Sequence, residues 1–264
     1  MKYLRTSTTV IRRLLAARTK LLLLDFDGTL APICESPESV RLGKRTKESL
    51  EAMGSSDRFK IAIISGRSLS DLTSHFQISS LIYVGNHGFE IKGKGLKLPQ
   101  RARSARRLET LMWHCSRKFE LELASVSGVR VENKNYTLSI HYRAVSAGML
   151  HEFNRKIESM QTKTVGWPVI WKKGKKVWEV HPYVRWGKGN MSLYLADKFS
   201  HALPIVIGDD FADEEMFDAL KDRGVTVRVG SSKSSKAKYY LKSCNEVGEF
   251  LKMLHIGDSS KRWK

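Results

Sequence analysis

The sequence predicts an α/β fold in which a doubly wound, mainly parallel sheet carries an inserted α+β segment. The first observation is that short apolar runs alternate with helix-like segments over residues 1–98 and 186–264. The second is that polar residues follow the apolar runs, as they do where parallel strands end at one edge of a sheet. The third is the stretch between these ranges, where strand pairs joined by short turns follow helices, a pattern typical of a small antiparallel sheet.

The first 20 residues carry six basic side chains and no acidic one, a composition that resembles an amphipathic import sequence. Apolar residues recur here at helical spacing, at Val10, Ile11, Leu14 and Leu15, directly before the first predicted strand. We therefore expect a helix packed on the core rather than a targeting segment.

The first predicted strand is the leucine run 21–24, which leads into Asp25-Phe26-Asp27-Gly28-Thr29. A continuous apolar run suits a strand buried on both faces of a parallel sheet, and ligands of such sheets gather at the carboxyl ends of the strands. Asp25 and Asp27 are two residues apart, so both side chains can face one ligand. Gly28 permits a tight exit and the close approach of an anion. The run therefore predicts a phosphoryl-transfer site.

The rest of the core continues the alternation of strands and helices. Predicted strands end in Ser65-Gly66-Arg67, in Gly85-Asn86-His87-Gly88 and in Gly208-Asp209-Asp210, so these polar groups should share one edge of the sheet. The predicted elements are helix 41–53, strand 60–64, helix 69–76, strand 81–84, helix 188–199, strand 204–207, helix 214–222 and strand 225–229.

The middle of the chain has the pattern α-β-β-α-β-β, with an arginine-rich helix over 101–119 and a second helix over 145–162. We expect a Rossmann-like core of residues 1–98 and 186–264 and an inserted α/β cap domain of residues 99–185, with linkers near Pro99 and Arg185. The predicted strands of the insertion are 121–126, 130–132, 136–142, 169–171 and 177–180.

Composition limits the class of protein. With 264 residues, of which 41% are hydrophobic, the chain can bury the cores of one large or two modest domains. Cys34, Cys115 and Cys244 have no paired spacing, which argues against a disulfide framework or a zinc site and favours a reducing compartment. No apolar stretch approaches the roughly 20 residues needed to cross a bilayer, so we expect no membrane partner.

The formal charge of +19 should attract polyanions, which makes nucleic-acid binding a second hypothesis. The basic residues are spread along the chain, however, and no nucleic-acid motif with interleaved aromatic residues is present. We expect a solvated basic surface that steers anionic substrates, and no nucleic-acid partner.

Two carboxylates at a strand end can divide the work of phosphate ester hydrolysis. We assign Asp25 as the nucleophile that forms an aspartyl-phosphate, and Asp27 as the general acid that protonates the leaving alkoxide and then takes a proton from water. Lys188 would neutralise the nucleophile and the phosphate oxygens, while Ser65 and Gly66 would bind phosphate by hydroxyl and backbone N–H.

The acidic run 208–215 would bring oxygen ligands to the same edge. Mg²⁺ prefers one or two carboxylates together with substrate oxygens and water. We expect it to bind Asp25, the backbone carbonyl of Asp27 and Asp209, with Asp213 acting directly or through water. Arg67 has two open interpretations, since it can bind the phosphate of the substrate or pair with a core carboxylate.

Each motif is common alone, but their order along the chain is specific. DFDGT, SGR, Lys188 and GDDxxDE match, in sequence, four blocks of the haloacid dehalogenase-like hydrolases. Further blocks, among them VGNHGFEI, VENKNYTLSIHYR and GKKVWEVHP, closely resemble the trehalose-6-phosphate phosphatases, and the resemblance covers about residues 21–217.

By this resemblance Glu132 and Lys134 match the family's ExK pair, and Glu179 matches its GKxVxE acid. Polar side chains on the strands of a small lid can supply the hydroxyl partners that a sugar needs. Spacing alone would favour ordinary exposed strand residues at these three positions. The implied sugar ligands are Glu132, Lys134 and Glu179 of the insertion and Asn86 and His87 of the core.

The resemblance implies an Mg²⁺-dependent hydrolase that converts trehalose 6-phosphate to trehalose and phosphate, the final step of trehalose biosynthesis. It implies a small-molecule phosphosugar substrate, a cytoplasmic location and a monomer. Because 264 residues leave no room for a second catalytic domain, we expect a trehalose-phosphate synthase to be a separate protein.

Three alternatives stay open at this point. A related phosphatase could act on sucrose phosphate, mannosylphosphoglycerate or another phosphosugar. A phosphomutase would use Asp25 covalently but must exclude water from the intermediate. A non-enzymatic nucleic-acid-binding protein would bind duplex or RNA with steep salt dependence.

Overall fold

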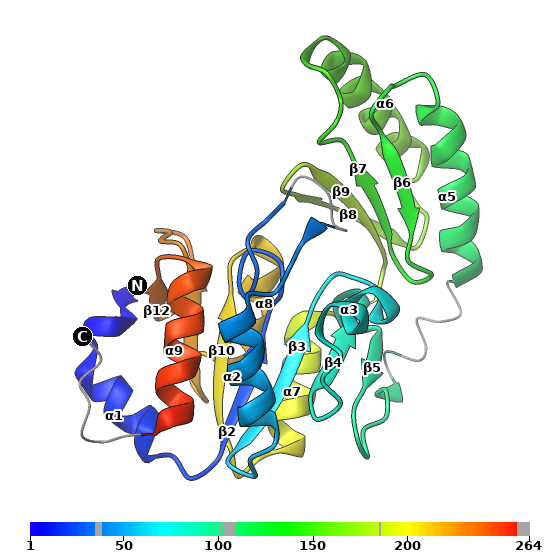
Figure 1. Cartoon of the computed structure of the whole chain (residues 1–264). Coiled ribbons are helices and arrows are strands. Elements are labelled where there is room, and N and C mark those ends of the chain that lie inside the picture. The colour runs from blue at the N-terminus through cyan, green and yellow to red at the C-terminus, as the bar shows by residue number, and fades with distance from the viewer. Residues whose placement is uncertain (35–38, 101, 103–108, 185, 258–264) are drawn as a thin grey trace. The chain divides into compact units, whose positions relative to one another are not determined.

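The computed structural model describes residues 1–34, 39–100, 102, 109–184 and 186–257. The chain divides into two compact units, each with its own sheet (Figure 1). The core unit consists of Met1–Leu98 and Trp186–Lys264, and the inserted unit consists of Pro99–Arg185. Arg185, one of the two expected linker positions, lies outside the described residues, as does most of the expected helical stretch 101–108.

The sheet of the core unit has eight strands in the order β1-β12-β11-β10-β2-β3-β4-β5. Every neighbouring pair is parallel except β4 and β5, which are antiparallel. This arrangement confirms the predicted mainly parallel sheet. The strands are β1 (Lys2–Tyr3), β2 (Lys20–Leu24), β3 (Phe59–Ile64), β4 (Ile82–Gly85), β5 (Glu90–Lys92), β10 (Leu203–Gly208), β11 (Val225–Val229) and β12 (Tyr239–Leu241).

Helices cover both faces of this sheet, because successive residues of a strand point to opposite sides. Leu22 and Leu24 belong to a hydrophobic cluster with residues of α1, α2, α3 and α9, whereas Leu21 and Leu23 belong to another with residues of α7 and α8. The leucine run of β2 is therefore buried on both sides, as its composition predicts. The helices are α1 (Thr8–Ala16), α2 (Lys44–Gly54), α3 (Leu69–Phe76), α7 (Lys188–Lys198), α8 (Glu214–Leu220) and α9 (Cys244–Ile256).

Strand β2 lies between β10 and β3, at the point where the strand order reverses. The chain proceeds from β2 outward through β3 and β4, and later from β10 outward through β11 and β12. Ligands of open α/β sheets bind at the carboxyl ends of the strands beside such a reversal. The topology therefore places the candidate site at the ends of β2 and β10.

The inserted unit contains a four-stranded antiparallel sheet in the order β6-β7-β9-β8. One face of this sheet packs on two helices through buried side chains that include Leu138, Ile140 and Val180 of the strands and Phe119 and Phe153 of the helices. This unit therefore has a hydrophobic core of its own. Its elements are α5 (Glu109–Leu123), β6 (Arg130–Asn133), β7 (Leu138–His141), α6 (Leu150–Lys163), β8 (Val169–Gly174) and β9 (Val177–Pro182).

One predicted strand is wrong. Residues 121–126 do not form a strand, because α5 continues through Leu123. Cys115, Phe119 and Leu123 recur every four residues and are all buried, whereas Leu121 is 80% exposed. That spacing is helical. The apolar composition of residues 121–126 favours a strand only when the spacing of the buried residues is ignored.

The structure also contains elements that the sequence pattern did not predict, namely the two-residue strand β1, the strands β5 and β12, and helix α9. Strands β5 and β12 have three residues each, too few for a periodic pattern. Helix α9 does have signals, since the Ser243 side chain caps its N-terminus and Gly257 ends it in a left-handed conformation. By contrast, the bounds of α3 and β11 agree with the predicted ranges 69–76 and 225–229.

The predicted N-terminal helix is confirmed as α1, and it is packed on the core. Val10 and Leu14 are buried in the same cluster as residues of β2 and α9. Among the described residues, no helix is long and apolar enough to cross a membrane. Cys34, Cys115 and Cys244 all lie among the described residues, and none of them forms a disulfide there.

We predict that Leu14→Ala lowers the free energy of unfolding by about 2 to 5 kcal/mol, because it leaves a cavity where a fully buried side chain packs. Urea denaturation of the whole chain measures the change. The control is Arg12→Ala on the exposed face of α1, which should change the value by less than about 0.5 kcal/mol. Equal effects of the two variants would mean that α1 is peripheral to the core.

Candidate active site

The carboxylates that follow β2 and β10 are brought together by the pairing of these two strands. Leu24 of β2 lies opposite Ile207 of β10. The backbone N–H of Asp25 donates to the carbonyl of Ile207 at 2.9 Å, so Asp25 extends the ladder by one residue. Asp209 follows two residues after Ile207. Both side chains are buried, at 5% and 6% exposure.

Lys188, the first residue of α7, bridges two buried carboxylates. Its Nζ lies 2.8 Å from Oδ1 of Asp25 and 2.7 Å from Oδ1 of Asp213. Burial alone would lower the pKa of Lys188, but the charges and hydrogen bonds of the two carboxylates raise it above its ordinary value. The ammonium group therefore stays charged beside Asp25.

The chain is anchored just before Lys188. The indole Nε1 of Trp186 donates to the carbonyl of Gly88 at 2.7 Å, in the loop that follows β4. Gly187 then caps the N-terminus of α7 in an extended conformation. These contacts fix the first turn of α7, and so the position of the lysine.

Asp213 organises the loop after β10. Its Oδ2 accepts from the backbone N–H groups of Asp209 at 2.9 Å and Asp210 at 3.0 Å, while its Oδ1 accepts from Lys188. A side chain at Gly208 would overlap the carboxylate of Asp213. Since both oxygens of Asp213 have partners, its clearest role is to hold Lys188 and the backbone that presents Asp209.

The acidic cluster has the donor set of a divalent metal site. One carboxylate oxygen from each of Asp25, Asp209 and Asp213 lies within 4.8 Å of the others. These three carboxylates and the ammonium of Lys188 sum to two negative charges, which a divalent cation would balance. Burial and the charge of Asp213 raise the pKa of Asp25 well above its usual range, with Lys188 acting in the opposite direction.

Gly28 permits the close approach of Asp209 to the turn after β2. Its φ is +87°, in the region that favours glycine, and a side chain there would overlap the Asp209 carboxylate. Its N–H donates to the carbonyl of Ala31 at 2.7 Å, which closes the turn. The structure thus confirms that Gly28 provides a tight exit from the strand.

Asp27 pairs with Arg67 rather than with the Lys188 cluster. Two nitrogens of the Arg67 guanidinium each lie 2.7 Å from a different oxygen of Asp27. A third contact joins Arg67 Nη1 to Oδ2 of Asp71, also at 2.7 Å. Burial would lower the pKa of Arg67, but the two carboxylates raise it. Of the two interpretations of Arg67, this structure has the ion pair with a core carboxylate.

The loops after β3 and β4 are joined by their backbones. The N–H of Asn86 donates to the carbonyl of Arg67 at 2.6 Å, and the N–H of His87 donates to that of Ser65 at 3.0 Å. Asn86 and His87 have φ values of 51° and 55°, which are uncommon for residues other than glycine and recur at functional sites. A side chain at Gly66 would overlap the imidazole of His87. The predicted phosphate-binding and sugar-binding residues of the core therefore form one connected structure.

The predicted sugar-binding acids of the inserted unit share one face of its sheet. Glu132 lies opposite Ser139, which in turn lies opposite Glu179. This face is the reverse of the one that packs on α5 and α6, because the alternate residues Val131, Ile140 and Val180 belong to the hydrophobic cluster. Lys134 directly follows β6, and its N–H donates to the carbonyl of Thr137 at 2.9 Å.

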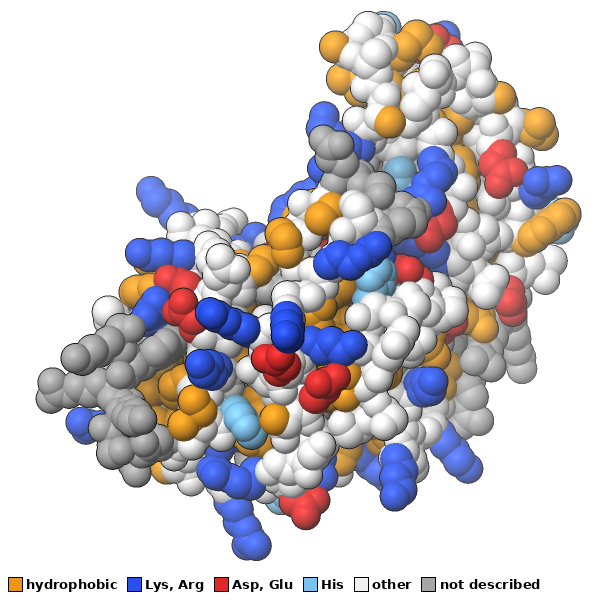
Figure 2. Space-filling model, in the orientation of Figure 1, with side chains coloured by type: hydrophobic (Ala, Val, Ile, Leu, Met, Phe, Trp, Pro, Cys, Tyr) orange, Lys and Arg blue, Asp and Glu red, His pale blue; other side chains and the backbone are white. Residues whose placement is uncertain are grey.

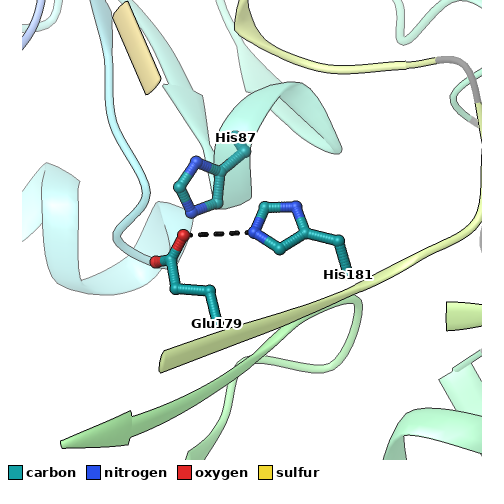
Figure 3. A group of neighbouring side chains, drawn as sticks. All are labelled: His87, Glu179 and His181. Atoms are coloured by element: carbon teal, nitrogen blue, oxygen red, sulfur yellow. Dashed lines mark hydrogen bonds and ion pairs between the residues drawn. The ribbon is translucent and has the colours of Figure 1, made fainter. Parts of the chain in front are cut away.

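Each of these acids is paired with a histidine. The Nε2 of His141 lies 2.8 Å from Oε2 of Glu132, and the Nε2 of His181 lies 3.1 Å from Oε2 of Glu179 (Figure 3). Burial acts to raise the pKa of Glu132, but the hydrogen bond from His141 and the nearby basic groups lower it to about 2. These pairings were not predicted from the sequence. Glu179 and His181 are two residues apart on β9 and so share a face, whereas Glu132 and His141 lie on the neighbouring strands β6 and β7.

The site geometry also includes residues that sequence reasoning missed. Asp71, which holds Arg67, lies four residues after it in the first turn of α3, and His75 follows four residues later. Asp71 and His75 lie on successive turns of α3, and Arg67 lies just before the helix begins, so this four-residue spacing is a signal in the sequence that could have indicated the contact. Space-filling Figure 2 shows that Lys and Arg side chains are scattered over the visible surface.

The doubly wound sheet, with its aspartate pair after the central strand and its acidic loop after the adjacent one, defines a haloacid dehalogenase-like hydrolase. Solved structures share this fold. The C-terminal domain of a Candida albicans trehalose-6-phosphate phosphatase matches 97% of this chain and 98% of its own with a TM-score of 0.81 at 22% identity. A sucrose-phosphatase from Synechocystis matches 90% of this chain and 98% of its own with a TM-score of 0.57 at 17% identity.

Sequence comparison identifies the family. The trehalose-phosphatase family model matches residues 23–245. A trehalose 6-phosphate phosphatase of Zea mays is 30% identical over 262 residues, covering 91% of this chain and 72% of the relative. A probable trehalose-phosphate phosphatase of Arabidopsis thaliana is 30% identical over 249 residues, covering 88% of this chain and 66% of the relative. The chain belongs to the trehalose-phosphatase family, and it is a phosphoric monoester hydrolase.

We predict that the destabilisation caused by Glu132→Gln decreases as the pH falls. The pKa of Glu132 is lowered from 4.5 to about 2 in the folded chain, so its pairing stabilises the fold fully above pH 4.5. This contribution is lost as the pH falls from about 4.5 to about 2. Urea unfolding of wild type and variant at pH 7, 5 and 3 measures the difference between them.

The control is Glu158→Gln on the exposed side of α6, which should change the free energy of unfolding little at each pH. A Glu132→Gln effect of constant size at all three pH values would contradict the prediction.

Proposed function

We propose that the chain hydrolyses trehalose 6-phosphate to trehalose and phosphate, the final step of trehalose biosynthesis. The observation that carries this proposal is the buried Lys188, which pairs with the carboxylate after the central strand in a chain of the trehalose-phosphatase family. The named relatives act on trehalose phosphate, and their similarity covers both units of this chain. The inserted unit is the proposed specificity cap, and the core unit is the proposed catalytic domain.

Asp25 is the proposed nucleophile. One of its carboxylate oxygens attacks phosphorus, and the bond from phosphorus to O6 of the sugar breaks, which gives an aspartyl-phosphate. The ladder bond to Ile207 fixes the backbone of Asp25, and Lys188 at 2.8 Å offsets charge on the attacking and phosphate oxygens. Asp27 gives a proton to the leaving O6. Water then attacks phosphorus, its proton goes to Asp27, and Asp25 is released with phosphate.

The residues at the end of β2 and β10 fit Mg²⁺. We assign Asp25, the backbone carbonyl of Asp27 and Asp209 as its ligands, with Asp213 directly or through water. When bound, Mg²⁺ supplies positive charge that stabilises the transferring phosphoryl group. The cluster of three buried carboxylates around one ammonium supports this assignment, because such a cluster carries excess negative charge.

The other site residues are assigned by position. The hydroxyl of Ser65 and the N–H of Gly66 lie after β3, beside the strand that carries the nucleophile, and are the proposed phosphate ligands. Arg67 stays a prediction as a phosphate ligand, since its guanidinium holds two carboxylates in this structure. The proposed sugar ligands are Asn86 and His87 in the core unit and Glu132, Lys134 and Glu179 in the inserted unit.

Several finer properties stay predictions from the sequence. These are the monomeric state, the cytoplasmic location and the separate trehalose-phosphate synthase that would supply the substrate. A sucrose-phosphatase shares the fold, so sucrose phosphate is the alternative substrate that the assay must include.

The purified chain with Mg²⁺ should release phosphate fastest from trehalose 6-phosphate, when compared with sucrose 6-phosphate, mannosylphosphoglycerate and glucose 6-phosphate. Asp25→Asn should lower kcat by at least about 10³-fold, because it removes the nucleophile while conserving volume. Phosphate release measures the rate, and circular dichroism checks that the variant is folded.

One control and two possible outcomes separate the alternatives. Chelation of Mg²⁺ should abolish turnover and its return should restore it. A different preferred ester would retain the phosphatase and reassign the cap. Substantial Mg²⁺-dependent turnover by folded Asp25→Asn would remove Asp25 from the nucleophile's role.

Glu179→Gln should lower kcat/KM for trehalose 6-phosphate by about 10- to 100-fold and leave p-nitrophenyl phosphate nearly unaffected, because the small ester has no sugar for Glu179 to bind. Glu158→Gln, in the same unit, is the matched control, and it should affect neither substrate. Equal losses on both esters would assign Glu179 a structural role.

A further inference from the structure

The guanidinium of Arg67 holds both oxygens of the proposed general acid. Nε lies 2.7 Å from Oδ2 of Asp27, and Nη2 lies 2.7 Å from Oδ1. Two parallel short bonds of this kind form a bidentate pair, which fixes the direction of a carboxylate as well as its distance. The side chain of Arg67 is only 9% exposed, whereas that of Asp27 is 34% exposed, so the guanidinium is shielded from water while the carboxylate stays partly accessible.

Arg67 is itself fixed from several sides. Its Nη1 contacts Oδ2 of Asp71 at 2.7 Å and Nε2 of His75 at 3.0 Å. Its guanidinium lies 5.2 Å from the ring centroid of Phe26, which is completely buried. Its backbone N–H donates to the hydroxyl of Ser65 at 3.2 Å. A side chain with this many contacts cannot follow Asp27 if the carboxylate moves.

This arrangement exceeds what a structural ion pair requires. Asp71 alone would neutralise the charge of Arg67. The second carboxylate on the same guanidinium is Asp27, two residues after the nucleophile and directly before the turn at Gly28. The additional partner is thus the one residue whose position matters for proton transfer in the proposed reaction.

The bidentate pair of Arg67 with Asp27, which we call the fork, also limits when Asp27 can act. A guanidinium has only donors, so an oxygen that carries a proton loses its bond to the N–H that faces it. In the conformation seen here both oxygens of Asp27 accept from Arg67. Proton delivery to O6 of the leaving sugar therefore requires one of the two bonds to open while the other keeps the carboxylate in place.

We propose that Arg67, held by Asp71, is the positioning residue for Asp27, and that one arm of the fork opens for proton transfer. The proposal rests on the proposed function. In the reaction the proton leaves one Asp27 oxygen for O6, the bond between phosphorus and O6 breaks, and the bond between phosphorus and Asp25 forms. The proton returns to Asp27 from the water that later attacks phosphorus.

Leaving-group dependence tests the proposal. An alcohol such as the sugar O6 must be protonated as it leaves, whereas nitrophenolate is stable without a proton. The value of kcat/KM reports the steps up to and including the first irreversible one, so it is independent of the later attack by water if the cleavage of the ester is irreversible. The two substrates are p-nitrophenyl phosphate and whichever sugar phosphate the wild type cleaves fastest.

Arg67→Gln should lower kcat/KM about 100-fold on the sugar phosphate and less than about 5-fold on p-nitrophenyl phosphate, since general acid catalysis contributes at least that much only where a proton is needed. Arg67→Lys, which keeps the charge but not the fork, should recover only part of the loss. Equal losses on both substrates would overturn the proposal and make Arg67 a phosphate ligand or a structural residue.

Two further variants make the test independent of folding. Asp71→Asn leaves the fork on Asp27 but loosens Arg67, and it should lower only the sugar phosphate rate, by about 10-fold. It decides the question if Arg67→Gln does not fold, and an unselective effect would overturn the proposal. The control is Arg228→Gln on β11, which breaks an ion pair of 2.9 Å with Glu214 of α8. This variant should affect the two substrates equally.

The proposed function fails in a different way. A wild-type chain that cleaves none of the esters would remove the phosphatase proposal itself. A wild type that is active together with an unselective Arg67→Gln would remove only the role of Arg67.

Discussion

The candidate active site depends on the ion pairs that the buried ammonium group of Lys188 forms with two carboxylates. The ammonium group joins the end of β2, through Asp25, to the loop after β10, through Asp213, and Asp213 in turn holds the backbone of Asp209 and Asp210. Removing one partner of such a buried ion pair leaves an uncompensated charge and costs about 3 to 5 kcal/mol. The residues proposed to do the chemistry are therefore also the residues that hold three segments of the core unit together.

Four of the predicted site residues each have a charged or histidine partner within their own unit. Asp25 pairs with Lys188, Asp27 with Arg67, Glu132 with His141 and Glu179 with His181. A ligand that uses one of these groups must replace or share its present partner, because a buried polar group without a hydrogen bond is costly. A ligand group that satisfies the side chain it meets gains binding energy, whereas a ligand that lacks that group leaves the side chain unsatisfied. Pairing of this kind favours selectivity over tight binding.

The sequence was sufficient for those parts of the fold that depend on periodicity and strand order. The leucine run 21–24 indicated a strand buried on both faces, and the ordered motifs after successive strands indicated one shared edge. It was insufficient where the outcome depends on partners far apart in the chain. Arg67 had two interpretations because Asp27 lies 40 residues away, and nothing local chooses between a phosphate and that carboxylate. Residues 121–123 appeared strand-like because composition was given more weight than the four-residue spacing of the buried side chains.

The bond from Trp186 to Gly88 has an evolutionary consequence. It anchors the chain where it re-enters the core unit, two residues before Lys188, and a side chain at Gly88 would press on the carbonyl of Gly187 beside it. The stretch between Leu98 and Trp186 has a hydrophobic core of its own, separate from those of the central sheet. An exchange of this module for one of different length or sequence would therefore leave the lysine in register with its carboxylates, and new substrate preferences can arise without rebuilding the phosphoryl-transfer machinery.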